Sequence, residues 1–159
     1  IANNAGDNIS KKLKLKREFV EIDNYGNEIQ IDPRNLKSSN SFYIKLTLEK
    51  LDSSNKNYLE NIALVQNLPS GWEIENTRLN NDPLLDKVAK ANSTITYTDI
   101  RDDKIMWFFN LYNKPQVVYV KINAVTPGNY TLPSAYAEAM YDGSYQASSD
   151  SFRVNVLSK

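Results

Sequence analysis

A strict alternation of apolar and polar side chains in several short segments limits the folds that are open to this chain. The alternation is clearest in SFYIKLTLEKL, residues 41–51. The apolar residues that share one parity, and are predicted to face a core, are Phe42, Ile44, Leu46 and Leu48. Because successive side chains of a β-strand point to opposite faces, a period of two predicts a half-buried strand rather than an amphipathic helix.

Seven more segments have the composition or the alternation of strands, and turn residues separate them every ~8–12 positions. They are residues 12–22, 29–31, 60–66, 94–102, 105–111, 116–125 and 151–157. About eight short strands with this spacing are typical of an antiparallel β-sandwich. The predicted fold class is therefore all-β, with one short helix at residues 83–90. This helix is expected because Asp82 fits an N-cap and Pro83 fits the first helical position.

The chain is predicted to form one domain. Its 159 residues are enough for a single hydrophobic core. Residues 1–11 are polar and are predicted to form a linker or arm, so the domain itself spans residues 12–159. The chain does not begin with Met and carries no visible signal peptide, and we expect it to be a piece of a larger protein.

Two segments depart from a simple strand pattern. In residues 12–22, Leu13 and Leu15 share one parity whereas Val20 and Ile22 share the other, which predicts a bulge or a strand in two halves. In residues 124–144, Pro133 argues that the residues after it do not form a central strand. We therefore expect residues 124–144 to form a long, shaped loop at one end of the domain, and such loops often carry function.

The composition argues against several classes of function. The 19 basic and 19 acidic residues give a formal net charge of zero. No nucleic-acid partner is expected, because binding to nucleic acids or anionic membranes needs a basic excess. Cysteine and histidine are both absent, which removes thiol catalysis, disulfides, thiolate metal sites and the usual general base. We expect no enzyme activity, no cofactor and no metal site.

One acidic cluster is a candidate site. Asp99, Asp102 and Asp103 lie within five positions, with Arg101 among them. Acidic residues before a hairpin usually serve the turn itself, and this is the favoured interpretation. A calcium site, which needs several oxygen ligands on one loop, and a pair of catalytic carboxylates are the alternatives. Glu138, Tyr141 and Asp142 lack a nucleophile and base and are not favoured as a catalytic site.

Four segments together resemble one protein family. They are FVEIDNYG at residues 19–26, NLPSGWEIEN at 67–76, TDIRDDKIMWFF at 98–109 and AVTPGNYTLPSAYAEAMY at 124–141. In this order and spacing they resemble the C-terminal domain of bacterial α2-macroglobulins, the tenth macroglobulin-like domain (MG10). The resemblance runs from about residue 13 to residue 157. It implies a macroglobulin-type β-sandwich.

The resemblance also implies a function for the parent protein. The parent is expected to be a large periplasmic protein, often a lipoprotein and so anchored to the inner membrane, that traps invading proteases. A protease cuts a bait region, the molecule collapses around it, and a Cys-Gln thioester in a preceding domain links to it covalently. A periplasmic penicillin-binding protein is a further implied partner.

Met140 and Tyr141 are the site residues that the resemblance implies. In the family this domain packs on the thioester domain and keeps water from the thioester, and the stretch around these two residues resembles the part that does so. A thioester persists only where water and amines are excluded. Met adapts its shape and Tyr adds contact area at low entropic cost, so both suit a cover. The alternative is that both side chains pack into this domain's own core.

The sequence leaves two classes of function open. The first is a structural and regulatory module of a protease inhibitor. The second is a cell-surface adhesin or ligand-binding β-sandwich that uses its tyrosine-rich loops as the binding face.

Overall fold

In a computed structural model, strands with alternating side chains form β-sheets that pack against one another. The structure describes residues 9–51, 58–75 and 95–158. The strands in the first half of the chain are β1 (Ser10–Lys11), β2 (Leu13–Ile22), β3 (Glu28–Gln30), β4 (Leu36–Lys37), β5 (Ser41–Lys50), β6 (Tyr58–Asn67) and β7 (Trp72–Ile74). Those in the second half are β8 (Tyr97–Ile100), β9 (Lys104–Tyr112), β10 (Gln116–Ala124), β11 (Gly128–Leu132), β12 (Ala135–Ala139), β13 (Asp142–Ser148) and β14 (Phe152–Leu157).

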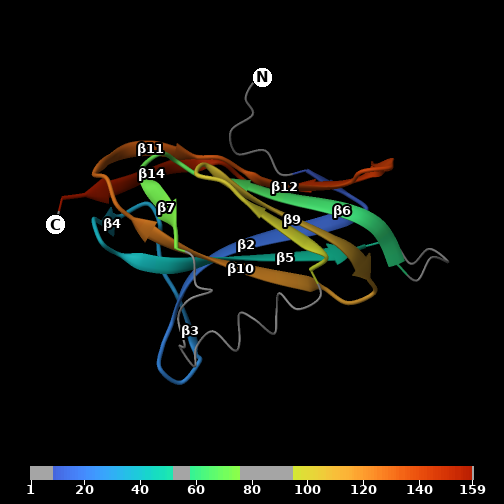
Figure 1. Ribbon diagram of the computed structural model, residues 1–159, viewed down its shortest axis with the longest axis horizontal. Coiled ribbons are helices and arrows are strands. Elements are labelled where there is room, and N and C mark those ends of the chain that lie inside the picture. Colours follow the sequence, from blue (N-terminus) through green and yellow to red (C-terminus); the bar gives the residue numbers. More distant parts are fainter. Residues whose placement is uncertain (1–8, 52–57, 76–94, 159) are drawn as a thin grey trace.

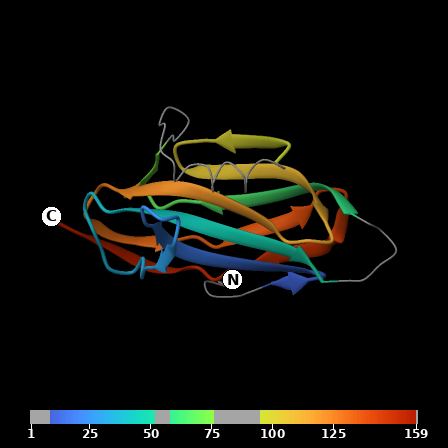
Figure 2. The same ribbon diagram turned by 90° about the horizontal axis from the view of Figure 1, so that it is seen from below.

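These strands form a two-layer sandwich with a small third sheet. The six-stranded sheet has the order β1-β13-β12-β6-β9-β8, the five-stranded sheet β3-β2-β5-β10-β7, and the three-stranded sheet β11-β14-β4. Figure 1 shows β12, β6 and β9 above β2, β5 and β10, and Figure 2 shows the lower layer from below. Pairing in the two larger sheets is antiparallel, so the predicted antiparallel β-sandwich is confirmed.

The core lies between the two larger sheets. The inward set predicted on β5 is confirmed, because Phe42, Ile44, Leu46 and Leu48 are all at most 1% exposed. Trp107 and Phe109 of β9 face them from the other layer and are equally buried. The ring of Phe42 meets Trp72 edge to face, with 5.1 Å between ring centroids. The alternation therefore identified this strand's core face correctly.

The bulge predicted in residues 12–22 is wrong. β2 is one strand, and its register with β5 runs without a shift from Leu13 opposite Lys50 to Val20 opposite Tyr43. The apolar parity changes because the two ends of β2 use different faces. Leu13 belongs to the main core, whereas Val20 packs with Tyr43 and Tyr119 in a small cluster on the outer face of the five-stranded sheet.

The long loop predicted at residues 124–144 is also wrong. This segment forms β11, β12 and the start of β13, and β12 is a central strand between β13 and β6. Pro133 does not interrupt the sheet because it lies in the link between β11 and β12, before the first paired residue. Ala135, Ala137 and Ala139 face the core with at most 5% exposure, so small side chains let β12 lie close to the opposite layer.

Two further predictions concern the short helix and the N-terminal arm. The helix predicted at residues 83–90 lies outside the described residues. Ser10 and Lys11, assigned to the polar arm, pair with Ala147 and Gln146 as strand β1. In the part of the chain that the structure describes, no helix is long and apolar enough to cross a membrane.

A half-buried arginine joins the layers on the core side of β2. One Nη of Arg17 donates to the Gln66 side-chain oxygen at 2.9 Å and to the Pro133 carbonyl at 2.8 Å, and the other donates to the Asp150 carbonyl. The guanidinium lies 5.5 Å from the ring centroids of Phe19 and Phe152. Burial lowers the pKa of Arg17 to about 10, although the charge of Asp150 opposes this shift.

We predict that Arg17→Ala lowers the free energy of unfolding by about 3 kcal/mol, since hydrogen bonds to charged groups contribute about 1.5–3 kcal/mol each and their acceptors here lose their donor. The matched control is Arg153→Ala. Arg153 is exposed and donates to Thr131 at the surface, so its loss is expected to change stability by less than about 0.5 kcal/mol. Urea unfolding followed by tryptophan fluorescence measures both, and equal effects would contradict the role of Arg17.

Candidate functional site

Met140 and Tyr141 link β12 to β13 at the tip of a hairpin. The last pair of this hairpin joins Ala139 and Asp142, so these two residues alone make the connection. Met140 is 44% exposed and Tyr141 is 85% exposed. These fractions contradict the alternative that both residues fill the domain's own core. The tip presents an apolar thioether and an aromatic ring to the solvent.

The backbone of the tip is held by a neighbouring strand. The Met140 N–H donates to the Asn61 carbonyl at 3.0 Å. Asn61 has a φ of 58°, a left-handed conformation that asparagine tolerates, and lies where the pairing of β6 with β9 shifts register. Asn61 in turn donates its N–H to the Asn110 side chain at 3.1 Å. This bulge lets β6 bond the tip itself and so anchors the backbone of Met140.

The start of β13 is held by a local turn. The Asp142 carboxylate accepts the Ser144 N–H at 3.1 Å and the Ser144 hydroxyl at 2.6 Å. Glu138, on the other side of the tip, is exposed. Asp142 thus has a structural role in the hairpin, and the group Glu138, Tyr141 and Asp142 has the geometry of a turn.

The acidic cluster at residues 99–103 forms the turn between β8 and β9. The Arg101 N–H donates to the Lys104 carbonyl at 2.8 Å, which closes a tight hairpin. The Arg101 guanidinium pairs with the Asp99 carboxylate at 3.1 Å. The predicted turn is therefore confirmed. Within residues 9–51, 58–75 and 95–158, no three acidic side chains gather in a way that could hold a metal ion.

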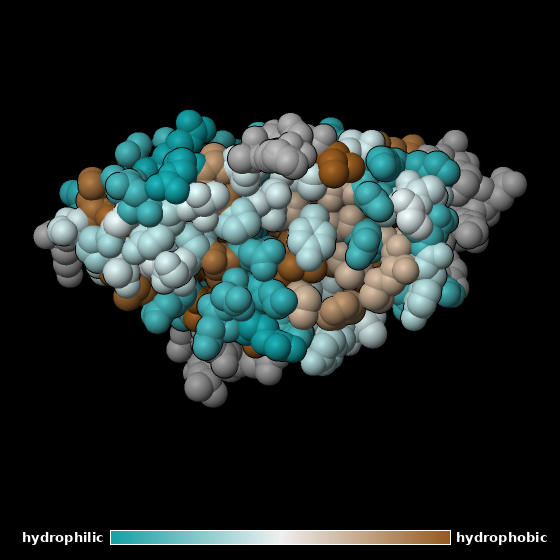
Figure 3. Space-filling model, turned by 90° about the horizontal axis from the view of Figure 1, so that it is seen from above, coloured by the Kyte–Doolittle hydropathy of each residue, from teal (hydrophilic) through white to brown (hydrophobic). Residues whose placement is uncertain are grey.

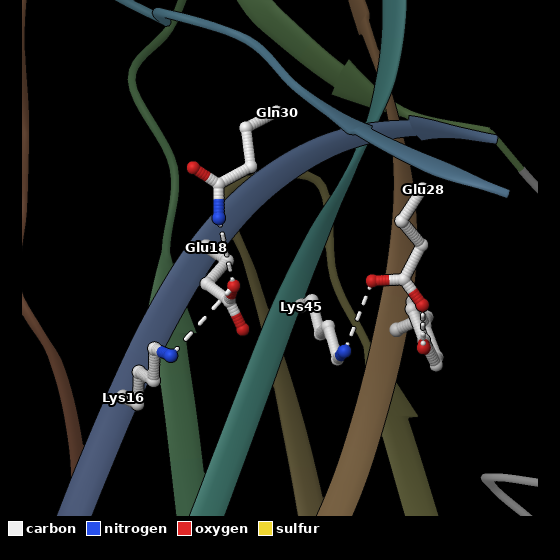
Figure 4. Close-up of polar contacts among 6 residues, drawn as sticks. Lys16, Glu18, Glu28, Gln30 and Lys45 are labelled. Atoms are coloured by element: carbon white, nitrogen blue, oxygen red, sulfur yellow. Dashed lines mark hydrogen bonds and ion pairs between the residues drawn. The ribbon is translucent and has the colours of Figure 1, made fainter.

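A polar cluster that the sequence analysis missed lies on the outer face of the five-stranded sheet. One oxygen of the Glu28 carboxylate pairs with the Lys45 ammonium at 2.9 Å, and the other accepts the Tyr119 hydroxyl at 2.7 Å. Figure 4 shows Lys45 and the Glu28 carboxylate facing each other from different strands. Burial, together with the bond to Glu28, raises the pKa of Tyr119. Tyr119 also packs with Val20 and Tyr43, which are 1% and 6% exposed.

A second carboxylate on this face is paired in the same way. Glu18 accepts a hydrogen bond from the Gln30 amide at 3.1 Å and lies 3.9 Å from the Lys16 ammonium. Because both carboxylates are paired with cations or amide donors, this face resembles an ordinary surface with ion pairs rather than an acid–base site.

An open pocket of about 410 Å³ lies at one end of the same sheet, lined by serines 38, 39 and 41 with Glu75 and Asn123. Glu75 pairs with the Lys121 ammonium at 3.0 Å and accepts a hydrogen bond from Asn123 at 3.1 Å. The bond from Lys121 is the main cause of a lowered Glu75 pKa. The pocket is therefore lined by hydroxyl groups and an already paired carboxylate.

Comparison with known proteins identifies the family. A family model described as the bacterial α2-macroglobulin MG10 domain matches residues 13–143. The chain belongs to this family. The α2-macroglobulin of Rickettsia conorii is 28% identical over 137 residues, which are 84% of this chain and 7% of that protein. Family membership confirms the resemblance and favours the macroglobulin module over an adhesin.

Solved structures have the same fold. The crystal structure of Salmonella α2-macroglobulin reacted with methylamine has a TM-score of 0.81 and 23% identity, and covers 97% of this chain but 10% of that one. That of trypsin-activated Escherichia coli α2-macroglobulin has a TM-score of 0.78 and 20% identity, and covers 94% and 11%. This chain thus spans about a tenth of the macroglobulins whose structures it matches.

We predict that acid weakens the fold partly through Asp23. Backbone N–H groups of the β2–β3 turn, that of Asn27 above all, hold the pKa of this carboxyl below its ordinary value. A lowered folded-state pKa gives stability that is present above the ordinary carboxyl pKa and is lost as the pH falls through the folded value. Asp23→Asn keeps an acceptor for these amides but removes the titration.

The stability of Asp23→Asn should therefore change less between pH 5 and pH 2 (about the range of carboxyl titration) than that of the wild type. Urea unfolding at several pH values measures this change. Parallel stability curves for the two proteins would show that Asp23 does not contribute.

Proposed function

We propose that this chain is the C-terminal macroglobulin-like domain of a longer, protease-trapping α2-macroglobulin. We further propose that it shields the thioester of that parent through Met140 and Tyr141. Membership of the MG10 family supports the first part. The observation that carries the second is the exposed Met-Tyr tip, whose backbone is fixed by β6 while its side chains point outward.

The tip has the chemistry that such a shield requires. Aminolysis of a thioester begins when an amine attacks the carbonyl carbon, and it ends with an amide and a released thiol. A cover of apolar side chains prevents this by excluding water and amines. Methylamine and trypsin are the reagents named for the Salmonella and E. coli relatives, and we propose that the parent of this chain responds to both.

The location and partners follow from the family as part of the same proposal. We place the parent in the periplasm, anchored to the inner membrane as a lipoprotein, with trapped proteases and a penicillin-binding protein as partners. The absence of cysteine from this domain suits an oxidising compartment, because no thiol can form a wrong disulfide.

We predict that the isolated chain neither cleaves nor inhibits a protease. It contains no cysteine or histidine, and a single 18.1 kDa domain cannot enclose a protease of similar size. The measurement is the hydrolysis rate of a protein substrate by the chain alone, and by trypsin and by elastase with a molar excess of the chain. Stoichiometric inhibition would contradict the proposal that the trap needs the rest of the parent.

We predict that Met140→Ala combined with Tyr141→Ala makes the thioester of the intact parent react faster with methylamine before any bait cleavage. A roughly tenfold increase is expected, which corresponds to about 1.4 kcal/mol of lost shielding. The rate of thiol release measures the reaction. An unchanged rate in a folded parent that carries a thioester would exclude the shielding role.

Two controls separate shielding from folding. Tyr25→Ala removes a tyrosine that is 90% exposed in the β2–β3 turn and should leave the methylamine rate unchanged. The double substitution should also leave the melting temperature of the isolated chain nearly unchanged, because surface truncations change stability by about ±0.5 kcal/mol. A large loss of melting temperature would instead indicate that the tip supports the domain's own core.

A further inference from the structure

The outer face of the six-stranded sheet carries two adjacent rows of side chains. Strand register places Tyr136, Val65, Met106 and Asp99 in one row. The other row holds Glu138, Ala63, Phe108 and Tyr97. The carboxylates of Asp99 and Glu138 stand at two corners, and the other six residues form a set that we call the aromatic face: Ala63, Val65, Tyr97, Met106, Phe108 and Tyr136. They come from four neighbouring strands, β8, β9, β6 and β12.

The aromatic face is open to solvent at its borders. Val65 and Ala63 form its floor and are 5% and 8% exposed, whereas Tyr97 and Tyr136 stand at its sides and are 60% and 42% exposed. The rings of Tyr97 and Phe108 lie 5.8 Å apart. Figure 3 shows brown and tan side chains gathered on the middle of the molecule's upper face, beside strongly hydrophilic ones. Apolar patches of this kind, with a polar border, mark protein contact surfaces.

The outer face of the opposite layer differs. There Glu28 pairs with Lys45 and accepts the Tyr119 hydroxyl, and Tyr119 packs with Val20 and Tyr43. Tyr43 and Tyr119 are only 6% and 5% exposed, whereas Tyr97 and Tyr136 of the aromatic face are 60% and 42% exposed, although the Arg101–Asp99 ion pair lies at its border. Tyrosine and methionine are also residues that protein interfaces favour, because they combine contact area with a hydrogen-bonding or adaptable group.

We propose that the aromatic face is the docking surface for a second domain of the parent chain, one that presents apolar side chains and accepts hydrogen bonds from Tyr97 and Tyr136. This inference rests on the proposed function, because it requires a longer parent. The length of the relatives favours this occupant, because they extend far beyond the tenth or less that this chain covers. The Met140–Tyr141 tip belongs to the same hairpin as Tyr136, with the exposed Glu138 between them.

Hydroxyl-radical footprinting of the intact, unmodified parent tests the proposal, with Tyr25 as the internal reference. If solvent reaches the aromatic face, Tyr97 should oxidise nearly as fast as Tyr25, since their exposed fractions here are 60% and 90%. If a domain covers the face, Tyr97, Tyr136 and Met106 should oxidise at least about fivefold more slowly than Tyr25, as desolvated contact residues do. Rates that follow the exposed fractions would overturn the proposal.

A matched pair of variants tests the contact directly. Tyr97→Lys with Tyr136→Lys places two charges in the docking surface, and Tyr25→Lys places one charge elsewhere. In the parent, oxidation of Met106 should rise at least threefold (about 0.7 kcal/mol) in the first variant only. An unchanged rate, or an equal rise in both variants, would overturn the proposal. Both tyrosines are at least 42% exposed, so the domain's own fold should tolerate the change.

A photo-crosslinking residue at position 136 identifies the occupant. A cross-link within one parent chain, to a segment outside residues 1–159, supports the proposal. A product of twice the parent mass would overturn it. So would a cross-link that forms only to trypsin, when trypsin is added, and to no segment of the parent. The thioester test remains separate. If Met106 is protected but the methylamine rate of the tip variant is unchanged, the docking surface is supported and the shield is rejected. If Met106 is not protected but the methylamine rate rises, the shield is supported and the docking surface is rejected.

Discussion

A half-buried guanidinium has to keep its hydrogen bonds, and this requirement ties the two layers of the sandwich together. Arg17 extends from the five-stranded sheet and is satisfied by Gln66 of the six-stranded sheet and by the Pro133 and Asp150 carbonyls. Gln66, fully buried, also donates to the Pro133 carbonyl at 3.1 Å. The two links that lead into β12 and out of β13 therefore converge on one side chain, which holds the base of the hairpin between the layers.

The same hairpin is held at three levels along its length. Arg17 fixes its base, the pairing of β12 with β6 fixes its middle, and the bond from Met140 to the Asn61 carbonyl fixes its tip. A tip that is held in this way can expose Met140 and Tyr141 without being free to move away from a partner surface. Preorganisation of this kind lowers the entropic cost of forming an interface, as the proposed shielding role would require.

Features of the fold with a local signal were predicted correctly from the sequence, and features that depend on distant partners were not. The alternation in β5 identified its core face, and four ordered motifs identified the family. The prolines of residues 124–144 led to the wrong prediction of a loop, because a proline interrupts a sheet only where its own residue would be paired. Pro133 comes before the first paired residue of β12. The inward position of Arg17 could have been predicted from the sequence, because Arg17 shares the parity of the apolar residues Leu13 and Leu15 and so lies on the same face of the strand.

The β-sandwich class, most of the strands and the family could be predicted from the residues alone, because a period of two and a series of motifs are properties of neighbouring residues. The central position of β12, the exposure of the Met-Tyr tip and the role of Arg17 between the sheets became visible in the folded chain. The partners that fix these features are far apart along the chain: Arg17 and Asp150 are 133 positions apart, and Met140 meets Asn61 only through the register of β12 with β6. Contacts at such separations leave no periodic trace in the sequence, so the folded chain alone establishes them.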